Sequence, residues 1–169
     1  MHRPEQVKVI IETNDGGVSV MSFVTVGYNM DGTIQFQREA SDENVDAEII
    51  KSRLDCKSWR FLEEGEEVPT DRTFRDAWID GLTKIDVDMV KAREIQKDRL
   101  RYERAPLLEK LDVDYMKALE SGNTILQAAI TAEKTLLRDI TKVPQIAKAK
   151  TPEELKAITV ATTINKVSK

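Results

Sequence analysis

The side chains that most enzymes use for catalysis are almost absent from this sequence. Among 169 residues there is one histidine, His2, and one cysteine, Cys56. Histidine-dependent acid–base catalysis, nucleophilic triads and histidine metal sites therefore lose their central residue. The carboxylates within Asp86–Asp88, and those within Asp112–Asp114, are two residues apart, which points them to different sides of a helix. We expect no enzymatic activity, no metal site and no cofactor.

Aromatic residues and long apolar runs are also scarce. Aromatics make up 5% of the chain, which indicates a modest core. No apolar stretch is long enough to span a bilayer, and no apolar run follows Met1–Pro4 as a signal peptide would require. A single cysteine excludes an intrachain disulfide and is compatible with a reducing compartment. We expect no membrane partner, and synthesis in a cytoplasm.

The charges are unevenly distributed although the formal net charge is only −4. From Thr141 onward the only acidic residues are Glu153 and Glu154. The basic residues there are Lys142, Lys148, Lys150, Lys156, Lys166 and Lys169. A basic segment can meet an acidic partner or nucleic acid, but no aromatic residue is interleaved here for base stacking. We interpret this segment as a solvated surface and do not expect nucleic acid as a partner.

The first half of the chain has the pattern of a small antiparallel sheet with one helix. Val7–Val26 alternates on both sides of an Asp-Gly-Gly turn, which predicts a β-hairpin. Thr33–Arg38 predicts a third strand, and Ser58–Leu62 predicts a further short one. A helix is predicted for Asp42–Leu54, capped by Ser41, whose hydroxyl can accept a hydrogen bond from a first-turn amide.

The segment Val68–Trp78 follows this sheet and predicts one short helix. Pro69 disfavours helix at the residue before it, and Gly81 is a suitable helix terminator. On such a helix Phe74 and Trp78 are four residues apart and share one face. One turn of helix is unstable alone, so this face must dock. The plainest interpretation is a core anchor between the two halves of the protein.

A second interpretation makes the same segment a partner-binding surface. Trp and Arg are frequent hot-spot residues in interfaces. The candidate residues are Arg72, Phe74, Arg75 and Trp78.

The second half predicts a helical arm. The longest helical pattern runs from Asp86 to about Glu120, and Pro106 predicts a kink or break that would divide it into two segments. A turn at Ser121–Asn123 leads into an amphipathic helix over Thr124–Ile140, so Pro106–Glu120 and Thr124–Ile140 should form an αα-hairpin. Thr151–Glu154 is a capping box that opens a final short helix, with fraying expected beyond Thr162.

The αα-hairpin has more apolar residues than one helix–helix seam requires. We expect Leu111, Tyr115 and Leu119 to pack on Ile130, Ala129 and Leu126. The surplus candidates for partner binding are Leu107, Leu136, Leu137 and Ile140, together with Leu108. Such a surplus is covered by self-association or by a helix or strand edge of a partner.

The segment Pro69-x-Asp-Arg-Thr-Phe-Arg-x-Ala-Trp78 also resembles a signature of small tail-region proteins of tailed bacteriophages. These proteins are often described as tail assembly chaperones or accessory virion proteins. Further segments that resemble this family are Val7–Phe23, Arg104–Asp112, Leu136–Ile140 and Thr151–Lys156. The resemblance implies phage tail proteins as partners and carries over no catalytic residue. It also implies a location in the host cytoplasm during assembly, or in the virion.

Together these observations predict an α+β protein with a β-rich domain at 1–81 and a charged helical arm at 82–169. The predicted function is a non-enzymatic tail-region protein that binds other tail proteins, as an assembly chaperone or a retained virion component. The alternatives are a head–tail or fibre adaptor, and a phage factor that binds and inhibits a host protein.

Overall fold

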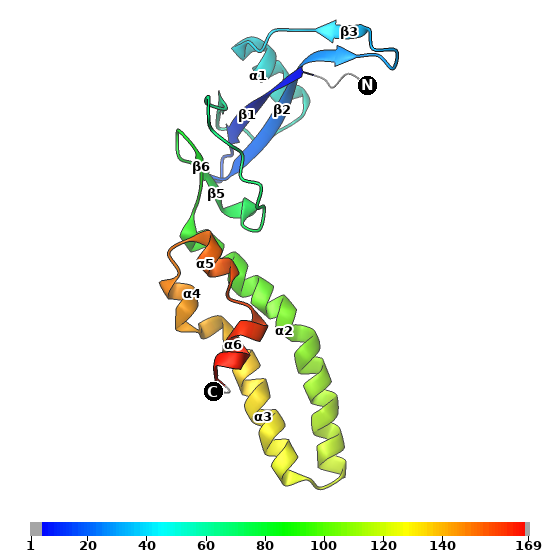
Figure 1. The fold of residues 1–169 in the computed structure, drawn as a ribbon, viewed down its shortest axis with the longest axis vertical. Helices are drawn as coiled ribbons and strands as arrows, with labels where there is room; N and C mark the ends of the chain where they lie inside the picture. Colours follow the sequence, from blue (N-terminus) through cyan, green and yellow to red (C-terminus); the bar gives the residue numbers. More distant parts are fainter. Residues whose placement is uncertain (1–4, 168–169) are drawn as a thin grey trace. The chain divides into compact units, whose positions relative to one another are not determined.

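The computed structural model describes residues 5–167, with the backbone alone for residues 165–167. The chain divides between Asp88 and Met89 into two compact units, an N-terminal sheet unit and a C-terminal helical unit (Figure 1). This arrangement confirms the α+β class. The division falls after Asp88 rather than after Gly81, because residues 78–87 form a small sheet that belongs to the first unit.

The N-terminal unit is built on a four-stranded antiparallel sheet with the order β3-β2-β1-β4. Its strands are β1 (Glu5–Glu12), β2 (Val18–Tyr28), β3 (Ile34–Gln37) and β4 (Ser58–Phe61). The predicted hairpin is confirmed, with Ile10 of β1 opposite Val20 of β2. Its turn needs Gly16, which has a φ of +79° that side chains with a Cβ rarely adopt.

Both faces of β1 are covered, which explains its continuous apolar run Val9–Ile11. On one face Val9 and Ile11 pack with Phe23 of β2 and with Val45 and Ile49 of α1 (Asp42–Lys51). Ser41 caps this helix as predicted, accepting a hydrogen bond from the backbone N–H of Asn44 at 3.4 Å. The helix ends at Lys51, three residues before the predicted Leu54.

The other face of β1 receives a second, two-stranded sheet. Ile10 and Val18 pack there with Trp78 of β5 (Trp78–Asp80) and Ile85 of β6 (Ile85–Val87). The predicted helix in Val68–Trp78 is therefore wrong. The segment contains only a single 3₁₀ turn over Arg75–Ala77, and Trp78 already belongs to a strand.

Gly81 lies in the β5–β6 turn instead of ending a helix, and its N–H donates to the Lys84 carbonyl at 3.0 Å. A Cβ at this position would stand 2.8 Å from the same carbonyl oxygen. The turn therefore requires glycine for lack of space.

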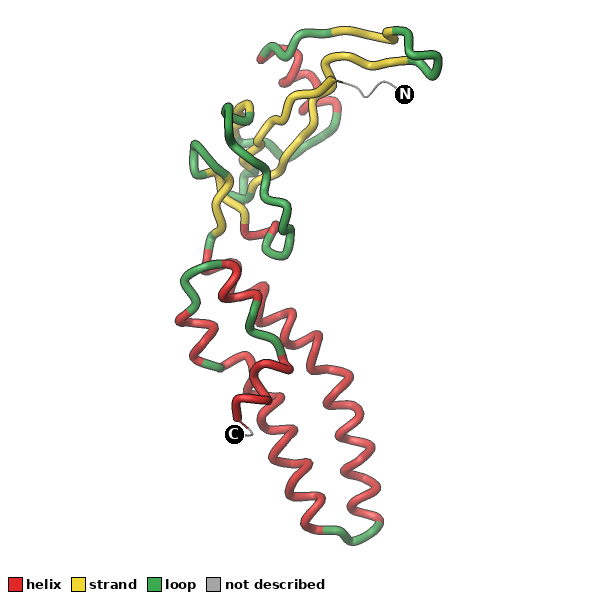
Figure 2. The backbone as a smooth tube through the Cα atoms, viewed as in Figure 1, coloured by secondary structure: helices red, strands yellow, loops and turns green. Residues whose placement is uncertain are grey.

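The C-terminal unit is an αα-hairpin with three short helices folded back on it (Figure 2). Its elements are α2 (Met89–Glu120), α3 (Thr124–Asp139), η2 (Ile140–Lys142), α4 (Pro144–Lys148), α5 (Pro152–Lys156) and α6 (Val160–Val167). The predicted turn is confirmed. Gly122 has a φ of +65°, and the N–H groups of Gly122 and Asn123 donate to the carbonyls of Leu119 and Ala118. This is the Schellman arrangement that ends a helix.

Helix α2 begins at Met89 rather than at Asp86 and continues through Pro106. The predicted break at Pro106 is therefore wrong, whereas a kink there stays a prediction. Pro106 and Tyr102, whose carbonyl loses its N–H partner, are both exposed, so water can bond to that carbonyl. Helix α6 continues to Val167, and the predicted fraying beyond Thr162 stays a prediction.

Polar side chains of α2 form hydrogen bonds to backbone carbonyls of the residues that follow it. Arg93 donates to the carbonyls of Ile146 and Ala149, at 3.2 and 3.0 Å. The Gln96 side chain is buried and donates to the Ile158 carbonyl at 2.6 Å. Arg104 donates to the Leu137 and Arg138 carbonyls at the end of α3. Some of the charged side chains of α2 therefore stabilise the helical unit through internal hydrogen bonds.

Candidate partner-binding surfaces

The aromatic residues of the Val68–Trp78 segment lie in the core. Phe74 is 4% exposed and Trp78 is 2% exposed, whereas Arg72 and Arg75 are exposed. Trp78 packs against Ile10, Val18 and Ile85. Both aromatic residues are thus core residues of the N-terminal unit, and the predicted role as an anchor between the two halves of the protein stays a prediction. The prediction that Phe74 and Trp78 belong to a partner-binding surface is wrong. Only Arg72 and Arg75 remain accessible to a partner.

The predicted apolar stripe of the αα-hairpin is also only partly exposed. Leu137 and Ile140 are buried, while Leu107 and Leu136 retain part of their surface. The reason is that α2, η2 and α6 all pack against α3. Helices from the end of the chain therefore enclose side chains that the pattern of α3 alone leaves open.

The hairpin seam differs in detail from the prediction. Ala118 and Ile130 are the buried residues towards the turn, whereas Leu119, Leu126 and Ala129 are exposed. Lys134 of α3 forms an ion pair with Asp112 of α2 and lies over the Tyr115 ring at 5.5 Å. The small Ala118 side chain thus occupies the position that was assigned to Leu119.

Large apolar side chains remain exposed at the closed end of the αα-hairpin. We call this set the hairpin-end surface, and its members are Val113, Met116, Leu119, Ile125 and Leu126. Ile125 is the most open, at 84% of its surface. Residues 123–132 contain no charged side chain, so half of α3 has no ionic group facing water. Of the residues of this surface, Leu119 and Leu126 were predicted to lie in the seam, and the other three were not assigned to a surface.

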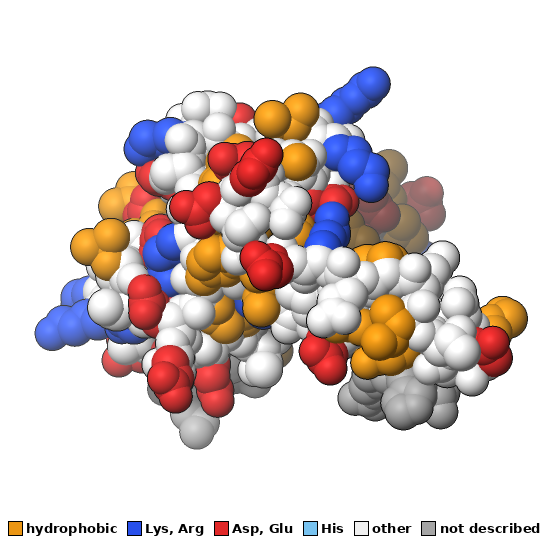
Figure 3. All heavy atoms as spheres, turned by 90° about the horizontal axis from the view of Figure 1, so that it is seen from above, with side chains coloured by type: hydrophobic (Ala, Val, Ile, Leu, Met, Phe, Trp, Pro, Cys, Tyr) orange, Lys and Arg blue, Asp and Glu red, His pale blue; other side chains and the backbone are white. Residues whose placement is uncertain are grey.

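A second exposed apolar group lies where the β2–β3 hairpin ends. Met30, Ile34 and Phe36 are exposed there, and Figure 3 shows hydrophobic side chains gathered on the lobe at its right. The Phe36 ring lies against Gly27, where an added Cβ would stand 2.3 Å from a ring carbon. β3 is an edge strand, and the register with β2 shifts between Gly27 and Tyr28. Such irregularity discourages pairing with a further strand.

The strongest charge cluster of the N-terminal unit is structural. Arg60 on β4 donates to both carboxylate oxygens of Glu66, at 2.7 and 2.9 Å, and to Asp80 at 2.8 Å. The Glu66 side chain is 1% exposed. These hydrogen bonds from Arg60 lower the pKa of Glu66 and of Asp80. The cluster ties β4, the following turn and β5 together, and it leaves little of the carboxylates accessible to a ligand.

Neither a metal cluster nor a membrane span is found in the part of the chain that the structure describes. Within residues 5–167, His, Cys, Asp and Glu side chains do not gather in threes as a metal ion would need. In the same range no helix combines the length and hydropathy needed to cross a bilayer. The absence of enzymatic activity stays a prediction.

Comparison with known proteins adds no relative. Neither a protein-family model, nor a curated protein, nor a solved structure matches this chain. The fold and the surfaces described above are therefore the basis for a functional proposal, together with the resemblance at Pro69–Trp78.

Proposed function

We propose that this chain is a non-enzymatic tail-region protein of a tailed bacteriophage that binds other tail proteins. It would act as an assembly chaperone or as a component retained in the virion. The tail context rests on the resemblance at Pro69–Trp78. The binding role is supported by one structural observation, the hairpin-end surface.

The hairpin-end surface leaves five large apolar side chains in contact with water. Two helices can bury only one seam between them, which here contains Ala118 and Ile130. Val113, Met116 and Ile125 keep more than half of their surface exposed. Burying an exposed apolar side chain in an interface contributes about 1.5–3 kcal/mol. The occupant that we assign is an apolar helix or strand edge of a tail protein before that protein assembles.

Co-expression with the tail-tube and tape-measure proteins of the same phage tests the proposal. We expect one of them to co-purify with this chain and to lose that association when Met116→Ser and Ile125→Ser are combined. Ile50→Ser is the matched control, because Ile50 is also widely exposed but lies on α1 of the other unit. It should leave the complex intact.

Mass spectrometry of purified virions then separates the two roles. A stoichiometric amount of this chain identifies a retained component, and its absence identifies a chaperone or another factor that does not enter the virion. The proposal is refuted if no tail protein forms a complex with this chain and particles made without it keep full infectivity. A specific complex with a host protein would instead favour an inhibitor of the host.

A further inference from the structure

A groove of about 740 Å³ lies between α4, α5 and α6 of the helical unit. Its apolar lining comes from both ends of α4 and from the residues that follow α5. The apolar lining residues are Val143, Pro144, Ala149, Ala157 and Ile158. Thr162 and Thr163 of α6 close one side. The groove is large enough for one or two apolar side chains of a partner.

Side chains of α2 form hydrogen bonds to the backbone of both walls of this groove. Arg93 bonds to the carbonyls of Ile146 and Ala149, which lie in and just after α4. Gln96 bonds to the carbonyl of Ile158, on the opposite wall. Because both walls are fastened to one helix, the groove exists before any partner arrives. Preformed sites bind at a lower cost in conformational entropy.

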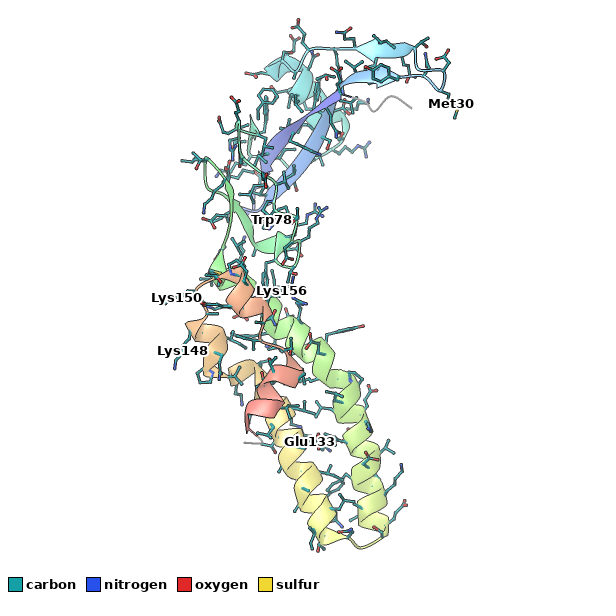
Figure 4. The ribbon with its side chains drawn as sticks, in the orientation of Figure 1. Met30, Trp78, Glu133, Lys148, Lys150 and Lys156 are labelled. Carbon is teal, nitrogen blue, oxygen red and sulfur yellow. The ribbon has the colours of Figure 1, made fainter. Side chains whose placement is uncertain are left out.

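Lys148 lines the groove, and two more lysines follow it closely in the sequence. Figure 4 shows Lys148 on α4, Lys150 in the next connection and Lys156 on α5. Lys148 and Lys150 are exposed, and no ion pair joins either to a carboxylate in the part of the chain that is described. Glu154 also lines the groove, but its carboxylate accepts a hydrogen bond from the Lys150 backbone N–H at 2.8 Å. The lining itself thus carries one lysine and one glutamate, and Lys150 is the adjacent cation outside it.

We propose that this groove binds an acidic, amphipathic segment of a partner protein. Apolar side chains of that segment would enter between α4 and α6, and its carboxylates would meet Lys148 and Lys150. The lining favours a protein over a nucleic acid, since no aromatic residue is present for base stacking and phosphates gain nothing from apolar walls. The groove is separate from the hairpin-end surface, so this proposal does not depend on the proposed tail function.

A fluorescein-labelled peptide with leucines at three- and four-residue spacing, and glutamate or serine elsewhere, is a suitable probe for the full chain. We expect saturable binding by fluorescence polarisation, with amide chemical-shift changes confined to residues 143–163. Two peptide controls replace glutamate with lysine or leucine with serine, and neither should bind. Added salt should weaken binding, because exposed charges are screened over about 10 Å at 0.1 M ionic strength.

Variants of the groove provide the stricter test. Ala157→Trp fills the groove from an exposed position and should raise the Kd at least about tenfold, the loss of one buried apolar side chain. Lys148→Glu should raise it by about two- to fivefold, as expected for an exposed charge pair. Lys110→Glu makes the same charge change on α2 away from the groove and should have no effect. Circular dichroism checks that each variant is folded. If Ala157→Trp does not fold, Gln145→Trp fills the groove from the opposite wall instead.

Three outcomes would overturn the proposal. The first is an absence of saturable binding of the acidic peptide. The second is equal binding of the lysine peptide. The third is unchanged affinity in the folded variant whose groove is filled.

Discussion

Replacement of Arg60 by methionine is the sharpest test of how the N-terminal unit is held together. Arg60 makes hydrogen bonds to Glu66 at 2.7 and 2.9 Å and to Asp80 at 2.8 Å. The side chains of Arg60 and Asp80 are about one-fifth exposed, at 20% and 18%, and that of Glu66 is 1% exposed. Methionine keeps much of the aliphatic volume but leaves two carboxylates close together without a cation.

The size of the effect follows from this burial. Removing one partner of a buried ion pair costs about 3–5 kcal/mol, because the remaining charge stays out of water. A domain of this size has a total stability of only about 5–15 kcal/mol. We therefore expect Arg60→Met to remove a large fraction of the free energy of unfolding of the N-terminal unit. The free energy of unfolding of Arg60→Lys should lie between those of the wild type and Arg60→Met. An ammonium group keeps the positive charge but cannot reproduce the planar hydrogen bonding of the guanidinium to both carboxylates.

Tryptophan fluorescence during urea unfolding measures this effect selectively. Trp59 and Trp78 are the two tryptophans of the chain, and both lie in the N-terminal unit. Lys57→Met is the matched control, because the Lys57–Glu12 ion pair is far more exposed. It should cost less than about 1 kcal/mol. If Arg60→Met costs no more than Lys57→Met, the buried hydrogen bonds of Arg60 do not stabilise the N-terminal unit.

Three further outcomes are expected. The pKa values of Glu66 and Asp80 are lower in the folded unit than their ordinary values of 4.5 and 3.8. The two carboxylates therefore stabilise the fold fully above their ordinary pKa values, and this stabilisation is lost as the pH falls through their folded-state pKa values. Urea titrations from pH 6 down to about pH 3 should therefore show a falling free energy of unfolding, with a shallower fall in Arg60→Met. Trp78→Ala should destabilise the same unit by about 3–5 kcal/mol, and the remaining Trp59 reports this; unchanged stability would contradict the core role. Pro106→Ala restores an N–H inside α2 and should stabilise the helical unit by about 1–3 kcal/mol in thermal unfolding followed at 222 nm; a lower melting temperature would show that the proline conformation is favourable there.

Local patterns predicted the elements whose residues make contacts close in the sequence. Alternation around a glycine turn was sufficient for β1 and β2, because their partner residues lie in adjoining segments. Ser41 and Thr151 identified the starts of α1 and α5, since each side chain bonds to the third residue after it. These signals are local, so no knowledge of the tertiary structure was needed.

The errors arose where contacts from far along the chain decided the outcome. Phe74 and Trp78 have the spacing of one helical face, but the sheet draws Trp78 into a three-residue strand that is too short to show alternation. Leu137 and Ile140 appeared to be surplus because nothing in α3 reveals the helices that return from the end of the chain. The groove was missed for the same reason, since α4 is only five residues long and has no side-chain cap.

The position of β1 in the middle of its sheet has a consequence for how the chain is made. Its first neighbour, β2, follows directly, but its second neighbour, β4, is translated only after β3 and α1. Until then one edge of β1 stays open beside the apolar run Val9–Ile11, and open edges are where nascent chains mispair. The αα-hairpin has no such interval, because α3 follows α2 after a three-residue turn and each new turn of helix finds its partner at once.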